Sequence, residues 1–166
     1  YRILNEKTVE KVEQKSVKTE YGKFNLILYK DLIFDETHMV LQKGKISKNS
    51  PTLVRVQQSN FFHDLLNINE FGARWSVSDA MKKINDAGKG VILLIDGEGN
   101  KVNEFNEINA SKKRRVSIPN NDPRRIGIGS QILRDLGVKK IKLMGSEVRY
   151  PSLSGFDLEV TEYLKK

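Results

Sequence analysis

An aspartate and an arginine lie two residues apart in this sequence, at Asp122 and Arg124, and such a pair could do chemistry. A guanidinium beside a carboxylate favours the ionised acid, and the carboxylate orients the guanidinium through a bidentate contact. The alternative is structural, because Pro123 between them is typical of a turn at which a carboxylate precedes a helix. From the residues alone we favour the structural interpretation.

Thiolate chemistry is excluded by composition, because the chain contains no cysteine. The sequence therefore excludes disulfides, thiolate nucleophiles and thiolate zinc sites. His38 and His63 are the only histidines, so a protein site for a soft metal is hard to assemble. On this inventory we do not expect zinc catalysis.

The formal net charge of +8 is compatible with nucleic acid, an anionic membrane surface or phosphorylated small ligands as partners. The densest basic run is SKKRRVS at Ser111–Ser117. It is either a phosphate-binding patch or a solvated loop, and we favour the loop because no aromatic residue interleaves with the charges. No apolar run approaches the ~20 residues of a membrane span, and no signal peptide is evident, so we expect a cytoplasmic protein without membrane contact.

The first half of the chain predicts strands. Residues 1–18 are polar and charged, which indicates an extended arm or linker. Three segments then alternate apolar and polar residues, at Lys23–Lys30, Thr37–Gly44 and Thr52–Gln58. Their short spacing predicts an antiparallel meander.

The second half predicts helix–strand units. A helix begins after Ser76 or Ser78 as N-cap and stops at Gly88, directly before an apolar strand at Gly90–Asp96. A long polar loop follows, at Gly97–Asn121, and a second helix is expected over Gly129–Gly137. VKKIKLMG predicts a further strand, and LEVTEYL a strand or short helix. Strands followed by helix–strand units indicate an α+β domain with a mixed sheet.

Five segments, in order, resemble the GTP cyclohydrolase II family. They are TEYGKFNLILYKD, PTLVRVQQSN, GKGVILLIDGEGN, DPRRIGIGSQILRDLGVKKIKLM and GFDLEVTE. The resemblance runs from about Thr19 to the end of the chain, and the fourth segment is the most specific. It implies a GTP cyclohydrolase II-like fold, with mixed or antiparallel sheets and packed helices.

The opening YRILNEKTVE resembles the linker that joins a 3,4-dihydroxy-2-butanone 4-phosphate synthase domain to a cyclohydrolase domain in bifunctional riboflavin-biosynthesis proteins. The resemblance implies that residues 1–18 are a linker from an N-terminal synthase domain and residues 19–166 a GTP cyclohydrolase II-like domain. The fused synthase domain is then the expected partner, and a homodimer is the expected assembly.

The family binds a catalytic zinc through three cysteines, and the matching positions here hold Asn60, Ser76 and Ser78. Neutral hydroxyl and amide groups cannot replace thiolate charge on a borderline-soft cation. We therefore expect no metal cofactor, and we expect one serine to cap the helix that follows.

The remaining roles that the resemblance implies fall on six residues. Asp122 matches the family's general base, and Arg124 matches the arginine proposed as its nucleophile. Arg55, Glu98, Gly99 and Arg149 match substrate-binding positions, but Asn100 replaces the arginine of the family's Glu-Gly-Arg signature. Packing residues are thus retained while most catalytic positions differ.

The prediction from this pattern is a degenerate copy, a pseudoenzyme that is zinc-free and inactive in GTP ring opening. It would be retained for dimerisation or for support or regulation of the fused synthase domain, with GTP or another nucleotide as a candidate ligand. One alternative is a residual GTP-binding enzyme that releases pyrophosphate through Asp122 and Arg124. A less favoured alternative is a basic nucleic-acid-binding module that uses the run Lys112–Arg115.

Overall fold

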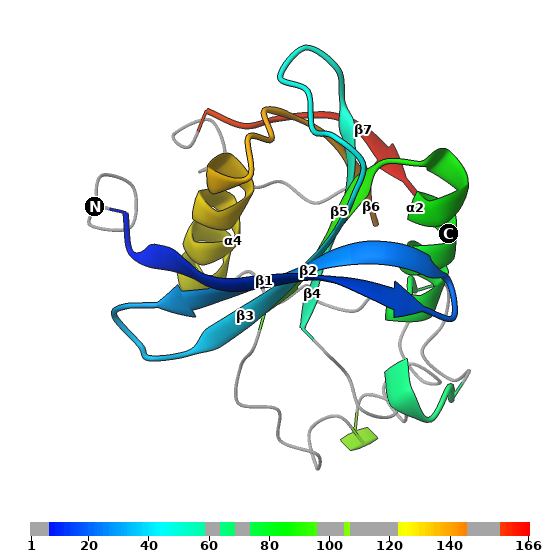
Figure 1. Cartoon of the computed structure of the whole chain (residues 1–166), viewed down its shortest axis with the longest axis horizontal. Helices are drawn as coiled ribbons and strands as arrows, with labels where there is room; N and C mark the ends of the chain where they lie inside the picture. The colour runs from blue at the N-terminus through cyan, green and yellow to red at the C-terminus, as the bar shows by residue number, and fades with distance from the viewer. Residues whose placement is uncertain (1–6, 59–63, 69–73, 96–104, 107–122, 146–156) are drawn as a thin grey trace.

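The protein is described by a computed structural model that covers residues 7–58, 64–68, 74–95, 105–106, 123–145 and 157–166. Within this part of the chain, the strands form one seven-stranded sheet in the order β1-β2-β3-β5-β4-β6-β7. Helix α4 lies against one face of the sheet and helix α2 against the other (Figure 1). The prediction of an α+β domain with a mixed sheet is confirmed at this level.

The elements follow the order expected from the periodicity. They are β1 (Val9–Thr19), β2 (Gly22–Asp31), β3 (Thr37–Lys43), β4 (Thr52–Gln58), α2 (Val77–Ala87), β5 (Gly90–Ile95), α4 (Pro123–Asp135), β6 (Lys140–Met144) and β7 (Glu159–Leu164). The closing segment, for which strand and helix were both open, is a strand. Among the residues described, neither helix combines the length and apolarity that crossing a bilayer requires.

The predicted antiparallel meander is wrong in its third strand. Strands β1, β2 and β3 do pair antiparallel in sequence order. However, β5 pairs with β3, and β4 lies beyond it, parallel to both β5 and β6. The helix α2 returns the chain across the sheet, as a parallel connection requires, and so places the apolar β5 at the centre.

Residues 9–18, which the sequence predicted as part of an arm or linker, form most of the edge strand β1 (Val9–Thr19). Most of its side chains are exposed on both faces, so the sequence shows no alternation between apolar and polar residues. Two contacts hold its start against α4: the Thr8 amide donates to Gln131 Oε1 at 2.8 Å, and Lys7 Nζ lies 2.8 Å from Asp135 Oδ1. The division into residues 1–18 and 19–166 stays a prediction.

Strand β5 contributes to both hydrophobic cores. Val91 and Leu93 face α4, in a cluster with Ile132, whereas Ile92 faces α2 and packs in a cluster with Ile84. All five side chains are fully buried. A strand covered on both faces explains why this segment is continuously apolar.

Tyr29, on β2, links the sheet to the end of α4. Its ring is fully buried, and its hydroxyl donates to Asp135 Oδ2 at 2.6 Å. Burial, together with this carboxylate, raises the pKa of Tyr29 above its usual value. Burial opposes ionisation of Asp135, but hydrogen bonds from Lys7 and Tyr29 outweigh it and lower the pKa of that carboxyl. The contact therefore joins β2, α4 and the start of β1.

Two glycines test how tightly the helices pack on the sheet. A Cβ at Gly90 would lie 2.7 Å from Cγ1 of the buried Ile84, whereas a Cβ at Gly129 would meet its nearest atom, on Leu93, at 3.5 Å. We expect Gly90→Ala to lower the free energy of unfolding by about 1–3 kcal/mol through overpacking. Gly129→Ala should leave it unchanged or raise it by up to ~1 kcal/mol, because alanine favours a helix. Urea denaturation measures both, and equal losses would contradict this packing.

Candidate functional site

Arg55, predicted as a substrate-binding residue, points its guanidinium at neighbouring protein groups. It donates from Nε to Gln57 Oε1 at 2.7 Å, from Nη1 to the carbonyl of Met144 at 2.9 Å, and from Nη2 to the carbonyl of Trp75 at 3.0 Å. The planar fork of an arginine suits such a set of acceptors. Arg55 thereby joins β4 to the end of β6 and to the segment that enters α2.

Asp64 extends this network to the start of α2. Its carboxylate accepts from Gln57 Nε2 at 3.2 and 3.1 Å and from the amide of Val77, the first residue of α2, at 3.0 Å. A carboxylate at a helix N-terminus satisfies an amide that has no partner inside the helix and complements the helix dipole. The sequence analysis missed Asp64, because it lies in a segment with no clear period.

Ser76 caps α2, as predicted for one of the two serines. Its backbone is extended (φ −84°, ψ 166°), and its Oγ accepts from the amide of Asp79 at 3.1 Å. Ser78 Oγ lies at hydrogen-bonding distance, 3.1 Å from Ser76 Oγ. At the other end, Gly88 adopts the left-handed conformation (φ 80°) expected of the stop signal.

The residues at the family's zinc positions do not fit a thiolate zinc site. The chain has no cysteine, and the Ser76 hydroxyl is engaged by a backbone amide in starting the helix. Neutral hydroxyls are poor ligands for zinc in comparison with thiolates. Asn60, the third position, lies outside the described residues.

The end of β7 closes over the same helix terminus. Trp75 Nε1 donates to the carbonyl of Leu164 at 3.0 Å, and Lys166 Nζ contacts the Asp79 carboxylate. Burial raises the pKa of Asp79, but hydrogen bonds with Lys166 and Ser76 outweigh it, so its pKa lies below the usual value. The first turn of α2 is therefore tied to β4, β6 and β7 together.

The structure brings Arg55, Ser76 and Ser78 to one place, around the N-terminus of α2. The other predicted site residues are not placed. Asp122, Glu98, Gly99 and Arg149 lie outside the described residues, and Arg124 is described only as backbone in the first turn of α4. Their functional roles stay predictions.

A model of the family "GTP cyclohydrolase II" matches residues 10–165. The chain belongs to the GTP cyclohydrolase II family. This agrees with the resemblance found in the motifs, and the match also includes most of β1.

Curated relatives and a solved structure align with nearly the whole chain. Proteins named 3,4-dihydroxy-2-butanone 4-phosphate synthase from Pseudomonas aeruginosa and Photobacterium phosphoreum are 41% and 36% identical over 99% of it. The crystal structure of RibBX, a two-domain 3,4-dihydroxy-2-butanone 4-phosphate synthase from A. baumannii, is 35% identical with a TM-score of 0.66. The chain spans 45% of the length of those two relatives and 42% of the RibBX chain.

These comparisons correct three predictions. The expected identity, a degenerate C-terminal domain of a bifunctional synthase and cyclohydrolase, is wrong, because relatives at 41% and 36% identity carry the synthase name alone. For the same reason, the predicted function as a degenerate GTP cyclohydrolase II domain is wrong. The predicted partner, a fused N-terminal synthase domain, is not supported either, because 99% of this chain itself aligns with proteins of that name. Motifs that record strand and helix packing are shared across a family and do not report the activity for which each member is named.

The capping role of Ser76 is testable against its neighbour. Ser76→Ala removes the acceptor for the Asp79 amide and should lower the free energy of unfolding by about 1 kcal/mol. Ser78→Ala is the matched control, and we expect a loss under about 0.5 kcal/mol, because Ser78 lies inside the helix. Urea unfolding followed by far-ultraviolet circular dichroism measures both variants. A greater loss in Ser78→Ala would contradict the assignment.

Arg55 has a structural role that a lysine cannot fill. Arg55→Lys keeps the charge but cannot reach three acceptors in a plane, so at least one of these part-buried acceptors loses its donor. We expect the free energy of unfolding to fall by about 1–3 kcal/mol. Arg134→Lys, on the exposed side of α4, is the control and should be neutral. Equal stability of Arg55→Lys and wild type would show that the network does not support the fold.

Proposed function

We propose that this chain takes part in forming 3,4-dihydroxy-2-butanone 4-phosphate in riboflavin biosynthesis. The observation that carries the proposal is the name of this product in relatives that align with 99% of the chain and in the RibBX structure. Other relatives, including one from Aquifex aeolicus at 35% identity, are named riboflavin biosynthesis protein RibBA. Their names support the same pathway.

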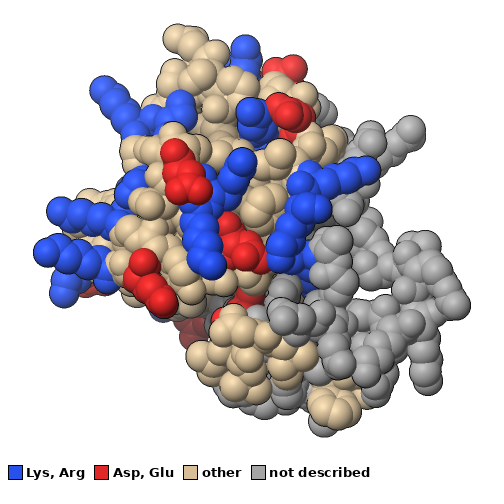
Figure 2. Space-filling view, turned by 90° about the vertical axis from the view of Figure 1, so that its right-hand side faces the viewer, with Lys and Arg blue, Asp and Glu red and all other residues tan. Residues whose placement is uncertain are grey.

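The charge of the chain suits a phosphorylated compound. The product carries a phosphate ester, and the chain carries a net charge of +8. Lysine and arginine side chains are spread over the described surface on the α2 side (Figure 2). A basic surface raises the local concentration of a small anion, and this effect falls with ionic strength.

The residues predicted from the family motifs belong to this proposal as candidate ligand contacts. Asp122 and Arg124 are the candidate reacting pair, and Glu98, Gly99 and Arg149 are candidate contacts to the anion. Arg55 is a weaker candidate, because its guanidinium already donates to three protein acceptors. We also propose that the mixed sheet is the GTP cyclohydrolase II fold, on the strength of the family match, and that the protein is cytoplasmic.

Genetic complementation tests the proposal. The gene product that contains this sequence, at its full natural length, is expressed in a bacterial strain that lacks 3,4-dihydroxy-2-butanone 4-phosphate synthase. We expect growth without added riboflavin, and detection of the four-carbon phosphate product by mass spectrometry in extracts. The full-length product is used because the chain spans less than half of the relatives that name the activity.

A strain that lacks GTP cyclohydrolase II is the matched control, and we expect no rescue there. Expression is verified by immunoblotting in both strains. Rescue of the cyclohydrolase strain with no rescue of the synthase strain would overturn the proposal. Failure in both strains with verified expression would overturn it as well.

A further inference from the structure

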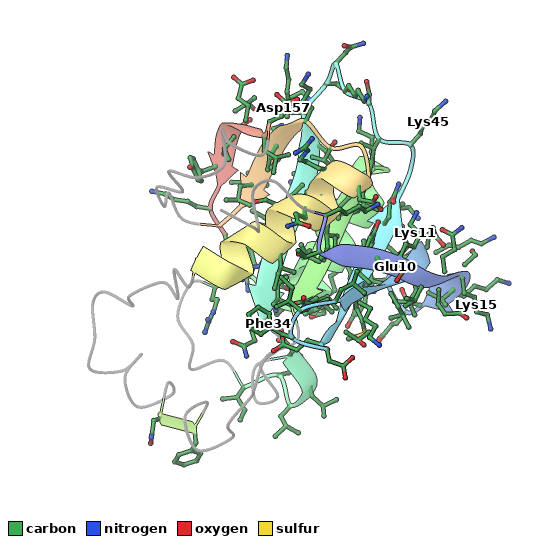
Figure 3. All side chains as sticks on the ribbon, turned by 90° about the vertical axis from the view of Figure 1, so that its left-hand side faces the viewer. Glu10, Lys11, Lys15, Phe34, Lys45 and Asp157 are labelled. Atoms are coloured by element: carbon green, nitrogen blue, oxygen red, sulfur yellow. The ribbon has the colours of Figure 1, made fainter. Side chains whose placement is uncertain are left out.

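The turn between β2 and β3 brings three potential metal ligands together. Asp31 is the last residue of β2, Glu36 immediately precedes β3, and His38 is the second residue of β3. One ligand atom from each lies within 4.8 Å of the other two. The turn is closed by its own backbone, since the Asp31 amide donates to the carbonyl of Glu36 at 2.8 Å. Phe34 marks its position in Figure 3.

The pleat of the sheet directs Asp31 and His38 to the same face. His38 is paired with Tyr29 across the two strands, and Asp31 follows Tyr29 by two residues. Tyr29 faces α4, so period-two alternation places all three on the α4 side. Asp31 is 1% exposed and His38 is fully buried, whereas the Glu36 side chain is 22% exposed.

The two oxygens of the Asp31 carboxylate have different surroundings in the described part of the chain. Its Oδ1 accepts from the amides of Ile33 at 2.9 Å and Phe34 at 3.3 Å. Its Oδ2 is buried and receives no hydrogen bond. Burying a carboxylate oxygen that accepts no hydrogen bond costs free energy of folding. Carboxylates that bind metals are commonly oriented by hydrogen bonds to their other oxygen, as the two amides orient Asp31 here. The geometry points to a cation beside Oδ2.

We propose that Asp31, Glu36 and His38 bind a divalent cation of the zinc class. One imidazole nitrogen and two carboxylate oxygens are ligands that Zn²⁺ accepts, and a soft thiolate is not needed for such a set. Two negative carboxylates compensate the charge of the ion in a buried place. This site is separate from Ser76 and Ser78, the two described residues at the family's zinc positions, which lie at the N-terminus of α2.

The ligand atoms of the three side chains must move slightly closer together to bind an ion. Tetrahedral ligation at about 2.0–2.1 Å places ligand atoms ~3.4 Å apart, whereas His38 Nε2 and Glu36 Oε2 lie 4.0 Å apart. Of the three side chains, Glu36 is the most exposed, at 22%, so we expect its carboxylate to be the one that adjusts on binding. The rival explanation is a proton in place of the metal, with a protonated His38 facing Glu36.

Isothermal titration of the whole chain with Zn²⁺, after treatment with EDTA, separates these explanations. We expect one equivalent to bind to wild type. Asp31→Asn keeps an acceptor for the two turn amides but removes the charged ligand, and Glu36→Gln removes the partly exposed ligand. Each should weaken Zn²⁺ binding at least ~10-fold, because losing even a residue that only orients a metal ligand commonly costs that much.

Two controls account for non-specific binding. Asp35→Asn changes an 84% exposed carboxylate in the same turn, and asparagine tolerates its left-handed backbone (φ 54°). His63→Gln removes the chain's other imidazole. Both should bind Zn²⁺ within about twofold of wild type.

Thermal unfolding with and without Zn²⁺ is the second measurement, because an ion that binds only the folded state raises the melting temperature. It should rise for wild type and Asp35→Asn but not for Glu36→Gln. Should Asp31→Asn fail to fold, Glu36→Gln still decides, because its side chain is partly exposed. Absence of stoichiometric binding to wild type, or equal binding to Glu36→Gln, would overturn the proposal and leave the protonated pair. Neither readout depends on the proposed function.

Discussion

The burial of β5 on both faces is the constraint on which the rest of the fold depends. Val91 and Leu93 need cover on the α4 side, and Ile92 needs cover on the α2 side. A strand of this kind is stable only in the interior of a sheet with a helix on each face. It therefore takes the central place between β3 and β4, and the two helices and the flanking strands are arranged around it.

Three of the residues that the resemblance matches to functional positions of the family, Arg55, Ser76 and Ser78, lie around the N-terminus of α2. Arg55 donates to the carbonyl of Trp75, Asp64 accepts from the amide of Val77, and Ser76 accepts from the amide of Asp79. Contacts from β4, β6 and β7 thus meet at the first turn of the helix. Ser76, at one of the positions where the resemblance implies a zinc ligand, serves here to start the helix. Capping and ligation compete for the same hydroxyl lone pairs and the same backbone approach, so one role displaces the other.

Family membership and activity rest on different residues. The family model matches residues 10–165, and the sequence motifs identified the same family. The activity carried in the relatives' names does not follow from that match, because one fold supports many functions through the groups placed on it. This is why the motifs identified the family but led to a wrong protein identity and function.

The sequence by itself determined the local elements. Alternation predicted β2, β3 and β4, the apolar run predicted β5, and Ser76 with Gly88 bounded α2, because each signal depends on residues adjacent along the chain.

Only the tertiary structure decided the order of the strands, the recruitment of β1 as an edge strand, and the partners of Arg55. It also decided the burial of Asp31 and His38. Their spacing in the sequence does not indicate that both side chains lie on the side of the sheet that α4 covers. These features depend on contacts between residues far apart in the sequence, and such contacts exist only after β5 and both helices have packed.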